Sequence, residues 1–158
     1  MKSSLNREFA LRHLFVTLLM LGLTFWFGYD GFIGYPSTPE AQLYEKIEGS
    51  KAPEGFDLKS FKTQKIKTQH GFTLLTFLAF LAVGGHLWSV KRFSFEFDDE
   101  GFNVNGKRRL WTDIKKIERK EWEKKGIIKV DGVKFDSWHH LGVKEFVEIL
   151  DKKTKGVS

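Results

Sequence analysis

Cysteine is absent from this 158-residue chain. Its absence excludes a disulfide framework, a thiolate metal site and a cysteine nucleophile. The chain also lacks an HExxH helix, a nucleophile elbow and a recognisable pair of catalytic carboxylates. The sequence therefore predicts a protein that is not an enzyme and that carries no cofactor and no metal.

Charged residues are missing from two long stretches, residues 13–29 and residues 68–90. As helices, they would reach about 26 Å and about 35 Å at about 1.5 Å per residue, and a bilayer core is about 30 Å thick. The sequence therefore predicts two transmembrane helices, at 13–29 and 71–90. The remaining residues form an N-terminal flank, a connecting loop and a C-terminal domain, at 1–12, 30–70 and 91–158.

The first apolar stretch follows a basic start, as the apolar region of a signal peptide also does. A signal peptide would end in a small-x-small cleavage site, whereas bulky and aromatic residues follow Gly28. Aromatic residues such as Trp26, Tyr29 and Phe32 are typical of the interface between a bilayer and water. We therefore expect an uncleaved membrane anchor.

Lysine and arginine are distributed unevenly around the two stretches. The connecting loop holds six lysines, which six acidic residues balance. The flanks that would share the other side of the membrane hold eight: Lys2, Arg7, Arg12, Lys91, Arg92, Lys107, Arg108 and Arg109. Because positive residues favour the cytoplasmic side, we expect a multi-pass protein of the bacterial inner membrane with both termini in the cytoplasm.

Small residues occur within both apolar stretches. Gly22 and Gly28 lie in the first, and Gly84 and Gly85 lie in the second. Lipid offers no hydrophobic drive for helix association, so small residues mediate close packing between membrane helices. We expect these four glycines at the contact between the two helices. The alternative is that they are merely tolerated in membrane helices.

The loop 30–70 is too long for a simple hairpin connection. Ser37 or Thr38 as N-cap, with proline in the first turn, predicts a short helix from Pro39 to Glu48. Lysines then alternate with apolar residues from Asp57 onward. This amphipathic stretch either contacts anionic lipid headgroups or serves as a solvated connector.

Apolar runs give way to alternation after residue 91, which predicts β-strands. The first hairpin has two possible turns near Asn105-Gly106, and we favour a three-residue turn because it sets Phe102 opposite Leu110. A two-residue turn at Asp131-Gly132 sets Val130 opposite Val133 and Ile128 opposite Phe135. Between the hairpins, the run 116–123 is read as a charged strand.

The last periodic segment is helical. Val143, Phe146, Val147 and Leu150 are spaced to form one apolar stripe, and lysines at the end favour the negative pole of the helix dipole: Lys152, Lys153 and Lys155. The predicted fold class is therefore a membrane hairpin of two helices plus a small α+β domain. In that domain an antiparallel sheet or partial barrel is capped by the C-terminal helix.

The segment FDDEGFNVNGKRRLWTDIKKI, residues 97–117, carries a family resemblance. It reads as a strand, an acidic turn, a short strand, a basic turn and a Trp-x-Asp-Ile-x-x-Ile step. Residues 93–153 thereby resemble the bacterial pleckstrin-homology-like (PH-like) domains of small membrane proteins. The resemblance implies about seven strands, of which six can be placed, and a binding or scaffold role without catalytic residues.

Three other motifs are weaker. Residues 101–108 partly match a phosphate-binding loop, but Arg108 replaces the required hydroxyl, so a hairpin explains them better. His13 and His86 could lie at the same membrane surface, which makes a bis-histidine haem conceivable. The acidic run 98–100 could hold a cation, although a solvated turn is the simpler interpretation.

Lys107, Arg108 and Arg109, with Lys91 and Arg92, are the residues expected to contact lipid or a partner. The alternative is that they serve solubility and topology. Nucleic acid is not expected, because acidic residues are mixed with the basic ones throughout the domain. Two functions follow: a membrane-tethered PH-like domain that binds protein or lipid, or a small accessory subunit of a larger membrane complex, such as an energy-converting one. The oligomeric state is left open.

Overall fold

The computed structural model of the chain describes residues 1–154. It divides into two compact units. We call Leu14–Gly84 the helical hairpin, and we call Met1–His13 together with Gly85–Ser158 the sheet domain. The first residues of the chain thus belong to the same unit as its C-terminal part.

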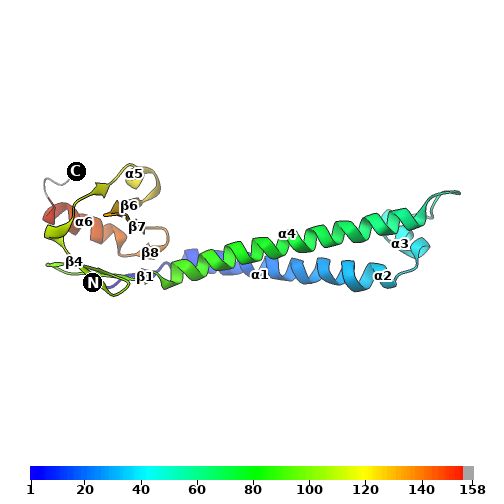
Figure 1. Ribbon diagram of the computed structural model, residues 1–158, viewed down its shortest axis with the longest axis horizontal. Helices are drawn as coiled ribbons and strands as arrows, with labels where there is room; N and C mark the ends of the chain where they lie inside the picture. The colour runs from blue at the N-terminus through cyan, green and yellow to red at the C-terminus, as the bar shows by residue number, and fades with distance from the viewer. Residues whose placement is uncertain (155–158) are drawn as a thin grey trace. The chain divides into compact units, whose positions relative to one another are not determined.

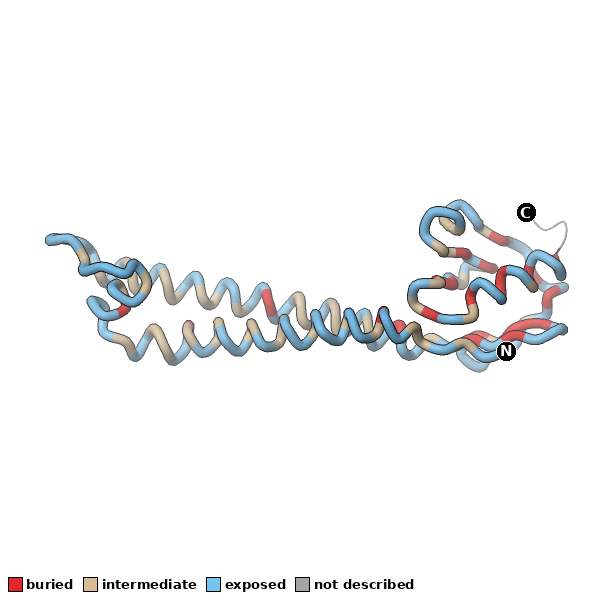
Figure 2. The backbone as a smooth tube through the Cα atoms, turned by 180° about the vertical axis from the view of Figure 1, so that it is seen from behind, coloured by how far each residue is buried: buried red, intermediate tan, exposed pale blue. Residues whose placement is uncertain are grey.

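Two long antiparallel helices form the helical hairpin (Figure 1). Helix α1 spans Arg7–Tyr29 and α4 spans Leu58–Arg92. Each contains a window that is long and apolar enough to cross a membrane. Only 6% and 11% of these windows are buried within the described chain. Figure 2 shows the same exposure along the tube.

The helices run beyond the stretches predicted to lie in the membrane. After α1 the chain continues through a π-helical turn, Asp30–Gly34, into the short helix α2, Tyr35–Ser37. The short helix expected in the loop is confirmed as α3, Glu40–Glu48. The amphipathic stretch that follows Asp57 is the first part of α4.

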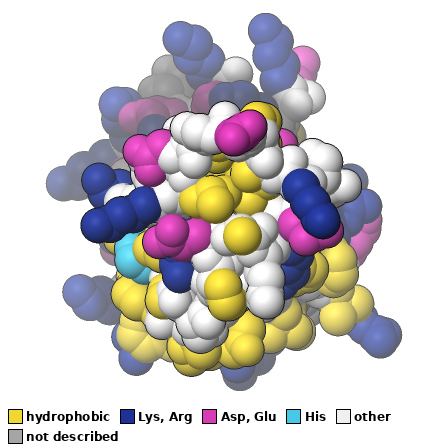
Figure 3. All heavy atoms as spheres, turned by 90° about the vertical axis from the view of Figure 1, so that its right-hand side faces the viewer, with side chains coloured by type: hydrophobic (Ala, Val, Ile, Leu, Met, Phe, Trp, Pro, Cys, Tyr) yellow, Lys and Arg dark blue, Asp and Glu magenta, His cyan; other side chains and the backbone are white. Residues whose placement is uncertain are grey.

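The segments that join α1 to α4 are held by specific contacts. Leu43 of α3 is fully buried. The rings of Tyr44, Phe56 and Phe61 form a cluster, with Tyr44 4.9 Å from each of the other two. The ammonium group of Lys62 donates hydrogen bonds to the carbonyls of Pro36 and Thr38, at 3.0 and 2.7 Å. In Figure 3, which views this end, acidic and basic side chains are interspersed and hydrophobic ones gather along one side.

Two three-stranded antiparallel sheets and a C-terminal helix form the sheet domain. One sheet has the order β2-β3-β4 and the other the order β5-β6-β7. The strands are Phe95–Phe97 (β2), Gly101–Val104 (β3), Lys107–Leu110 (β4), Ile117–Glu118 (β5), Ile127–Val130 (β6) and Val133–Asp136 (β7). A 3₁₀ turn, Trp111–Asp113, follows β4, and the predicted C-terminal helix is confirmed as α6, Val143–Lys153. Lys155 lies outside the described residues.

The two hairpin predictions had opposite outcomes. The β6–β7 register is confirmed, with Val130 opposite Val133 and Ile128 opposite Phe135. The three-residue turn between β3 and β4 is wrong, because the structure has a two-residue turn that sets Phe102 opposite Arg109. Asn105 and Gly106 both have positive φ, 49° and 84°, as a type I′ turn requires, and this turn geometry determines the register.

The charged strand predicted at 116–123 is mostly wrong. Strand β5 covers only Ile117–Glu118, and residues Trp122–Lys125 form the helical turn α5. The ion pair between Glu121 and Lys125, at 2.7 Å, has the i,i+4 spacing that favours a helix over a strand. Gly126 ends this turn in the left-handed conformation.

The N-terminal segment is a strand that the sequence did not reveal. Its first residues pair with β2: the Ser3 N–H donates to the Phe95 carbonyl, and the Phe97 N–H donates to the Met1 carbonyl, both at 2.9 Å. Strand β1, Ser4–Leu5, then pairs with β8, His140–Leu141. The N-terminus thus connects β2 to the segment after β7.

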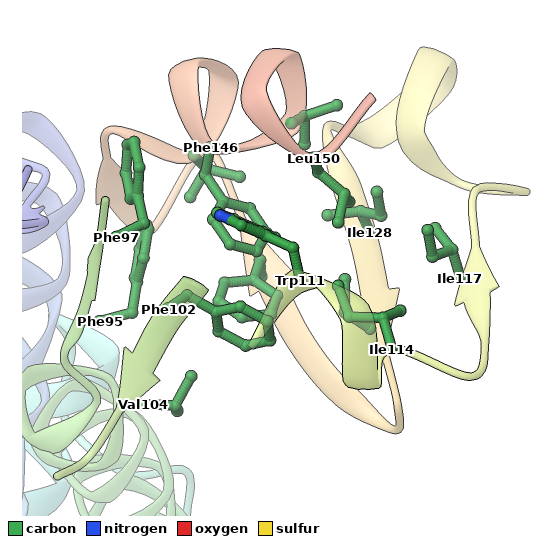
Figure 4. Packing of buried hydrophobic residues seen from close by; sticks show 14 residues of the cluster. Phe95, Phe97, Phe102, Val104, Trp111, Ile114, Ile117, Ile128, Phe146 and Leu150 are labelled. Carbon is green, nitrogen blue, oxygen red and sulfur yellow. The ribbon is translucent and has the colours of Figure 1, made fainter. Parts of the chain in front are cut away.

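Aromatic side chains fill the core between the sheets and α6. Phe146 of α6 is fully buried and stacks on Phe135, with ring centroids 4.4 Å apart. It also lies 5.3 Å from Phe102 and 5.7 Å from Trp111, toward which it points in Figure 4. The whole core cluster is Phe95, Phe97, Phe102, Val104, Trp111, Ile114, Ile117, Ile128, Val130, Phe135, Val143, Phe146, Val147 and Leu150.

Candidate functional site

Arg108, one of the predicted contact residues, is engaged in a bidentate ion pair. Its guanidinium donates to both carboxylate oxygens of Asp98, at 2.6 and 2.8 Å. Asp98 also accepts hydrogen bonds from the backbone N–H groups of Glu100 and Gly101. These bonds, that from Arg108 foremost, hold the pKa of Asp98 well below its usual range. Within the acidic run 98–100, Asp98 therefore closes a turn.

The other basic residues of this strand differ from one another. Arg109 lies 3.9 Å from a carboxylate oxygen of Asp131, which itself accepts two backbone hydrogen bonds from the segment before β5. Lys107 is exposed and has no ion-pair partner among residues 1–154. The structure thus leaves one of these three cations unpaired.

Lys91 and Arg92 end helix α4. Arg92 places its guanidinium 3.8 Å from the centre of the Trp88 ring, a cation–π contact. Trp88 is itself largely exposed. An exposed aromatic ring beneath a cation, at the end of an apolar helix, is the combination that favours the interfacial region of a bilayer.

Two of the four predicted packing glycines lie at the contact between the helices. A Cβ atom on Gly28 would lie 3.7 Å from the Thr73 methyl group, and one on Gly84 would lie 3.4 Å from that of Thr17. Gly22 and Gly85 have open space where a Cβ would be. Small residues therefore allow close approach at two levels of the hairpin.

Polar contacts that sequence reasoning missed also join the helices. The hydroxyl group of Thr24 donates to the hydroxyl oxygen of Thr76 at 3.0 Å, and the Thr76 hydroxyl in turn donates to the carbonyl of Phe72 in its own helix. Farther along, His70 lies 3.1 Å from the carbonyl of Gly31 and stacks on Phe32. Gly31 lies in the π-helical turn, and a Cβ there would lie 2.7 Å from the His70 ring.

The sheet domain contains a cluster of three histidines around Phe9. Phe9, which is 1% exposed, lies 4.0 Å from His13, 6.0 Å from His86 and 4.5 Å from His139, measured between ring centroids. The ring of His86 lies 5.6 Å from His13 and 5.3 Å from His139. We call Phe9, His13, His86 and His139 the histidine cluster. The pairing of His13 with His86 was anticipated, but Phe9 and His139 were not.

His140, the neighbour of His139, points elsewhere. Its ring is perpendicular to that of His139, is 5% exposed, and lies 3.2 Å from the carbonyl of Val90 near the end of α4. Desolvation lowers the pKa of His140, and backbone hydrogen bonds to Val90 and Phe93 partly oppose that effect. His140 is therefore a neutral, hydrogen-bonded packing residue at neutral pH.

A cavity of about 220 Å³ adjoins the histidine cluster. Asp136 lies 3.6 Å from Nδ1 of His139 and 3.2 Å from the ammonium group of Lys134. Burial lowers the pKa of His139; Asp136 raises it, while the neighbouring His86, Lys134 and His140 lower it further. The cavity is lined by His86, Ser89, Val90, Phe93, Lys134, Asp136, His139 and His140.

Within residues 1–154, no group of three or more histidine and acidic side chains is arranged to hold a metal ion. The rings of the histidine cluster contact one another in tilted and T-shaped pairs. Comparison of the chain with models of known families, with curated proteins and with solved structures gives no match.

Proposed function

We propose that this chain is a bacterial inner-membrane protein whose helical hairpin tethers a PH-like binding or scaffold domain, with both termini in the cytoplasm. One observation carries the proposal: two antiparallel helices with exposed apolar side chains lead directly into a small domain with its own aromatic core. Exposure of such an apolar surface to water would be unfavourable, whereas its contact with lipid has no such cost.

The topology of the sheet domain supports the PH-like interpretation. Two antiparallel sheets of three strands enclose a core that a C-terminal helix completes. The N-terminal segment, bridged to β2 between Lys2 and Glu96, adds a further strand at the edge of the first sheet. It would supply the seventh strand that the resemblance implies. A fold of this kind presents loops and edges for binding but does not itself identify the ligand.

Basic residues at the domain ends of both helices support the orientation. Arg7 and Arg12 lie at the start of α1, and Lys91 and Arg92 lie at the end of α4. Positive residues next to membrane helices favour the cytoplasmic side. Lys107 and the α4 cations would then be available to anionic lipid or to an acidic partner protein, each contributing about 1 kcal/mol near a charged membrane surface.

The exposed aromatic residues of α1 favour a second function, that of an accessory subunit in a larger membrane complex. Phe15, Phe25 and Trp26 are 68%, 70% and 67% exposed. Aromatic rings of this size are common anchors in protein interfaces. Mass measurement after extraction in mild detergent separates the two functions, because a subunit would bring its partners in fixed stoichiometry and a self-sufficient tether would not.

The absence of cysteine makes the membrane topology directly testable. Ser50→Cys places a thiol between α3 and α4, and Thr112→Cys places one in the sheet domain; both positions are exposed. We expect a membrane-impermeant maleimide to label Ser50→Cys in intact cells and to leave Thr112→Cys unlabelled. The unsubstituted chain is the blank, and opened cells, in which both variants must react, are the control.

Two results would contradict the proposal. Labelling of Thr112→Cys but not Ser50→Cys in intact cells would place the sheet domain outside the cytoplasm. Recovery of the chain in an alkaline carbonate wash, which strips peripheral proteins, would mean that the helical hairpin does not span the membrane.

A further inference from the structure

The histidine cluster joins three separate parts of the sheet domain. Phe9 and His13 come from the beginning of α1, His86 comes from the last turns of α4, and His139 comes from the turn between β7 and β8. His13 also lies 3.0 Å from the carbonyl of Phe9 through its Nδ1. These tilted and T-shaped ring contacts hold the domain ends of both long helices beside the β7–β8 turn.

Backbone and cation–π contacts reinforce the same junction. The N–H of Asn6, just before α1, donates to the carbonyl of His139 at 2.8 Å. Arg12 lies 5.5 Å from the Trp138 ring and also pairs with Glu8. The β7–β8 turn is thus bound to α1 on both sides of Phe9.

Basic and protonatable groups outnumber acidic groups around the histidine cluster. Cations or potential cations come from every element: Arg12 and His13 from α1, His86 from α4, and Lys134, His139 and His140 from the β7–β8 region. The acidic residues are Asp136, which lies within ion-pair distance of both His139 and Lys134, and Glu8, which forms an ion pair with Arg12. When the rings are neutral, these charges nearly balance. Protonation of His13, His86 and His139 would place three positive charges around one buried phenyl ring.

We propose that the histidine cluster is an acid-sensitive latch, which holds the ends of α1 and α4 against the β7–β8 turn when its rings are neutral and releases them when they are protonated. The repulsion acts between rings whose centroids are 5.3 and 5.6 Å apart, and one aspartate offsets only part of it. Phe9 is buried, His13 and His139 are partly buried and His86 is exposed, so protons can reach the rings from water. Histidine clusters that gain charge are a recurrent basis of pH-dependent switching.

The direction of the pH dependence follows from linkage. The pKa of His139 is lower in the closed cluster than in water, so the open state binds more protons. The closed state is therefore fully favoured above the free imidazole pKa of about 6.5 and loses stability as pH falls below that value. The buried His140 of β8, whose pKa desolvation also lowers, adds a dependence of the same sign, whereas the core cluster beneath the two three-stranded sheets consists of apolar side chains.

Hydrogen–deuterium exchange on the full chain in detergent micelles tests this latch. Exchange is compared at about pH 7.5 and about pH 5.5, on either side of the imidazole pKa, after correction for the intrinsic pH dependence of exchange. We expect several-fold faster corrected exchange at the lower pH in residues 6–13, 86–92 and 137–141. Amides of β6 and β7 away from the turn should show little change.

The double variant His86→Phe/His139→Phe keeps aromatic rings in the cluster but cannot take up protons there. It should lose most of the pH response, whereas His70→Phe, a histidine of the helical hairpin, should keep it. If the double variant fails to fold, the single variants each remove one proton site, and each should show a smaller response than the unsubstituted chain.

Three results would overturn the proposal. The first is corrected exchange that is the same at both pH values in the unsubstituted chain. The second is a pH response of undiminished size in the double variant or in both single variants. The third is acceleration that extends equally into β6 and β7, which would indicate general acid unfolding of the domain and no local release.

Discussion

At the scale of single residues, Asp98 organises the turn between β2 and β3. Its carboxylate accepts hydrogen bonds from Arg108 and from two backbone N–H groups, and its carbonyl accepts one from the indole of Trp111, at 3.0 Å. The side chain of this exposed residue thus connects the turn to strand β4, and its backbone carbonyl binds a core aromatic residue. The FDDEG sequence predicted a turn, but nothing in it distinguished Asp98 from its neighbour Asp99.

Replacing Asp98 by asparagine should lower the thermal unfolding temperature, because the charge that binds Arg108 is lost. The native pKa of Asp98 is depressed, chiefly by Arg108, so its contribution is present above the unfolded aspartate pKa of about 3.9 and disappears as pH falls below it. We expect the difference in melting temperature between the two chains to be constant from neutral pH to about pH 4 and to shrink below that.

Asp99→Asn is the matched control, because the Asp99 side chain is 98% exposed and its nearest cation, Lys153, is 3.8 Å away. Its melting temperature should follow that of the unsubstituted chain. Equal melting of Asp98→Asn and Asp99→Asn at neutral pH would show that the bidentate pair has no structural role.

At the scale of secondary-structure elements, the sequence predicted the features that apolar spacing and alternation specify. It failed where the backbone conformation of a turn set the strand register against the apolar pairing. The apolar stripe of α6 and the register across Asp131-Gly132 were predicted correctly, because alternation and spacing specify them. The β3–β4 register was not, since apolar pairing of Phe102 with Leu110 was favoured over the type I′ turn. In the structure Leu110 remains 43% exposed. Turn geometry therefore outweighed one apolar cross-strand pair.

The N-terminal strand could not be predicted for a different reason. Strand β1 has two residues, too few to show a period, and its partners are more than 90 positions away in the chain. The sequence predicted only part of the histidine cluster. Two antiparallel apolar helices would place His13 near His86, but no local sequence pattern indicates that His139 lies beside them. The pairing of short segments that lie far apart in the chain is the part of this fold that sequence patterns do not predict.

Helix α6 should depend on Phe146 more than on any other residue of its stripe. Phe146 is fully buried and contacts rings from both sheets. Phe146→Ala removes most of this side chain from a closed core and should lower the free energy of unfolding by about 3–5 kcal/mol. Chemical denaturation of the full chain in micelles, followed by circular dichroism, measures the loss.

Glu148→Ala, on the exposed side of the same helix, is the comparison and should change the stability by about 0.5 kcal/mol or less. A loss under about 1 kcal/mol for Phe146→Ala would mean that the helix does not cover the core as described.

At the scale of the whole molecule, the sheet domain is assembled from both ends of the chain. Residues 1–13 belong to it, and the helical hairpin is inserted between them and residue 85. The hydrogen bonds of Ser3 and Phe97 place the N-terminal segment along the edge of β2. Without that segment, the β2 edge would expose backbone donors and acceptors, which destabilises a sheet and invites association.

A chain that lacks the helical hairpin should therefore be more stable when it keeps the N-terminal segment. Residues 1–13 joined by a short glycine–serine linker to residues 85–154 should give a cooperatively melting domain, because the His13 and His86 rings lie side by side where the linker begins and ends. Residues 85–154 alone should melt at a lower temperature and self-associate. Lys2→Ala in the joined chain, which removes only the exposed ion pair with Glu96, should have little effect. Equal melting temperatures for the joined and shortened chains would show that the domain is complete without the start of the chain, so that the pairing at the β2 edge contributes nothing to its stability.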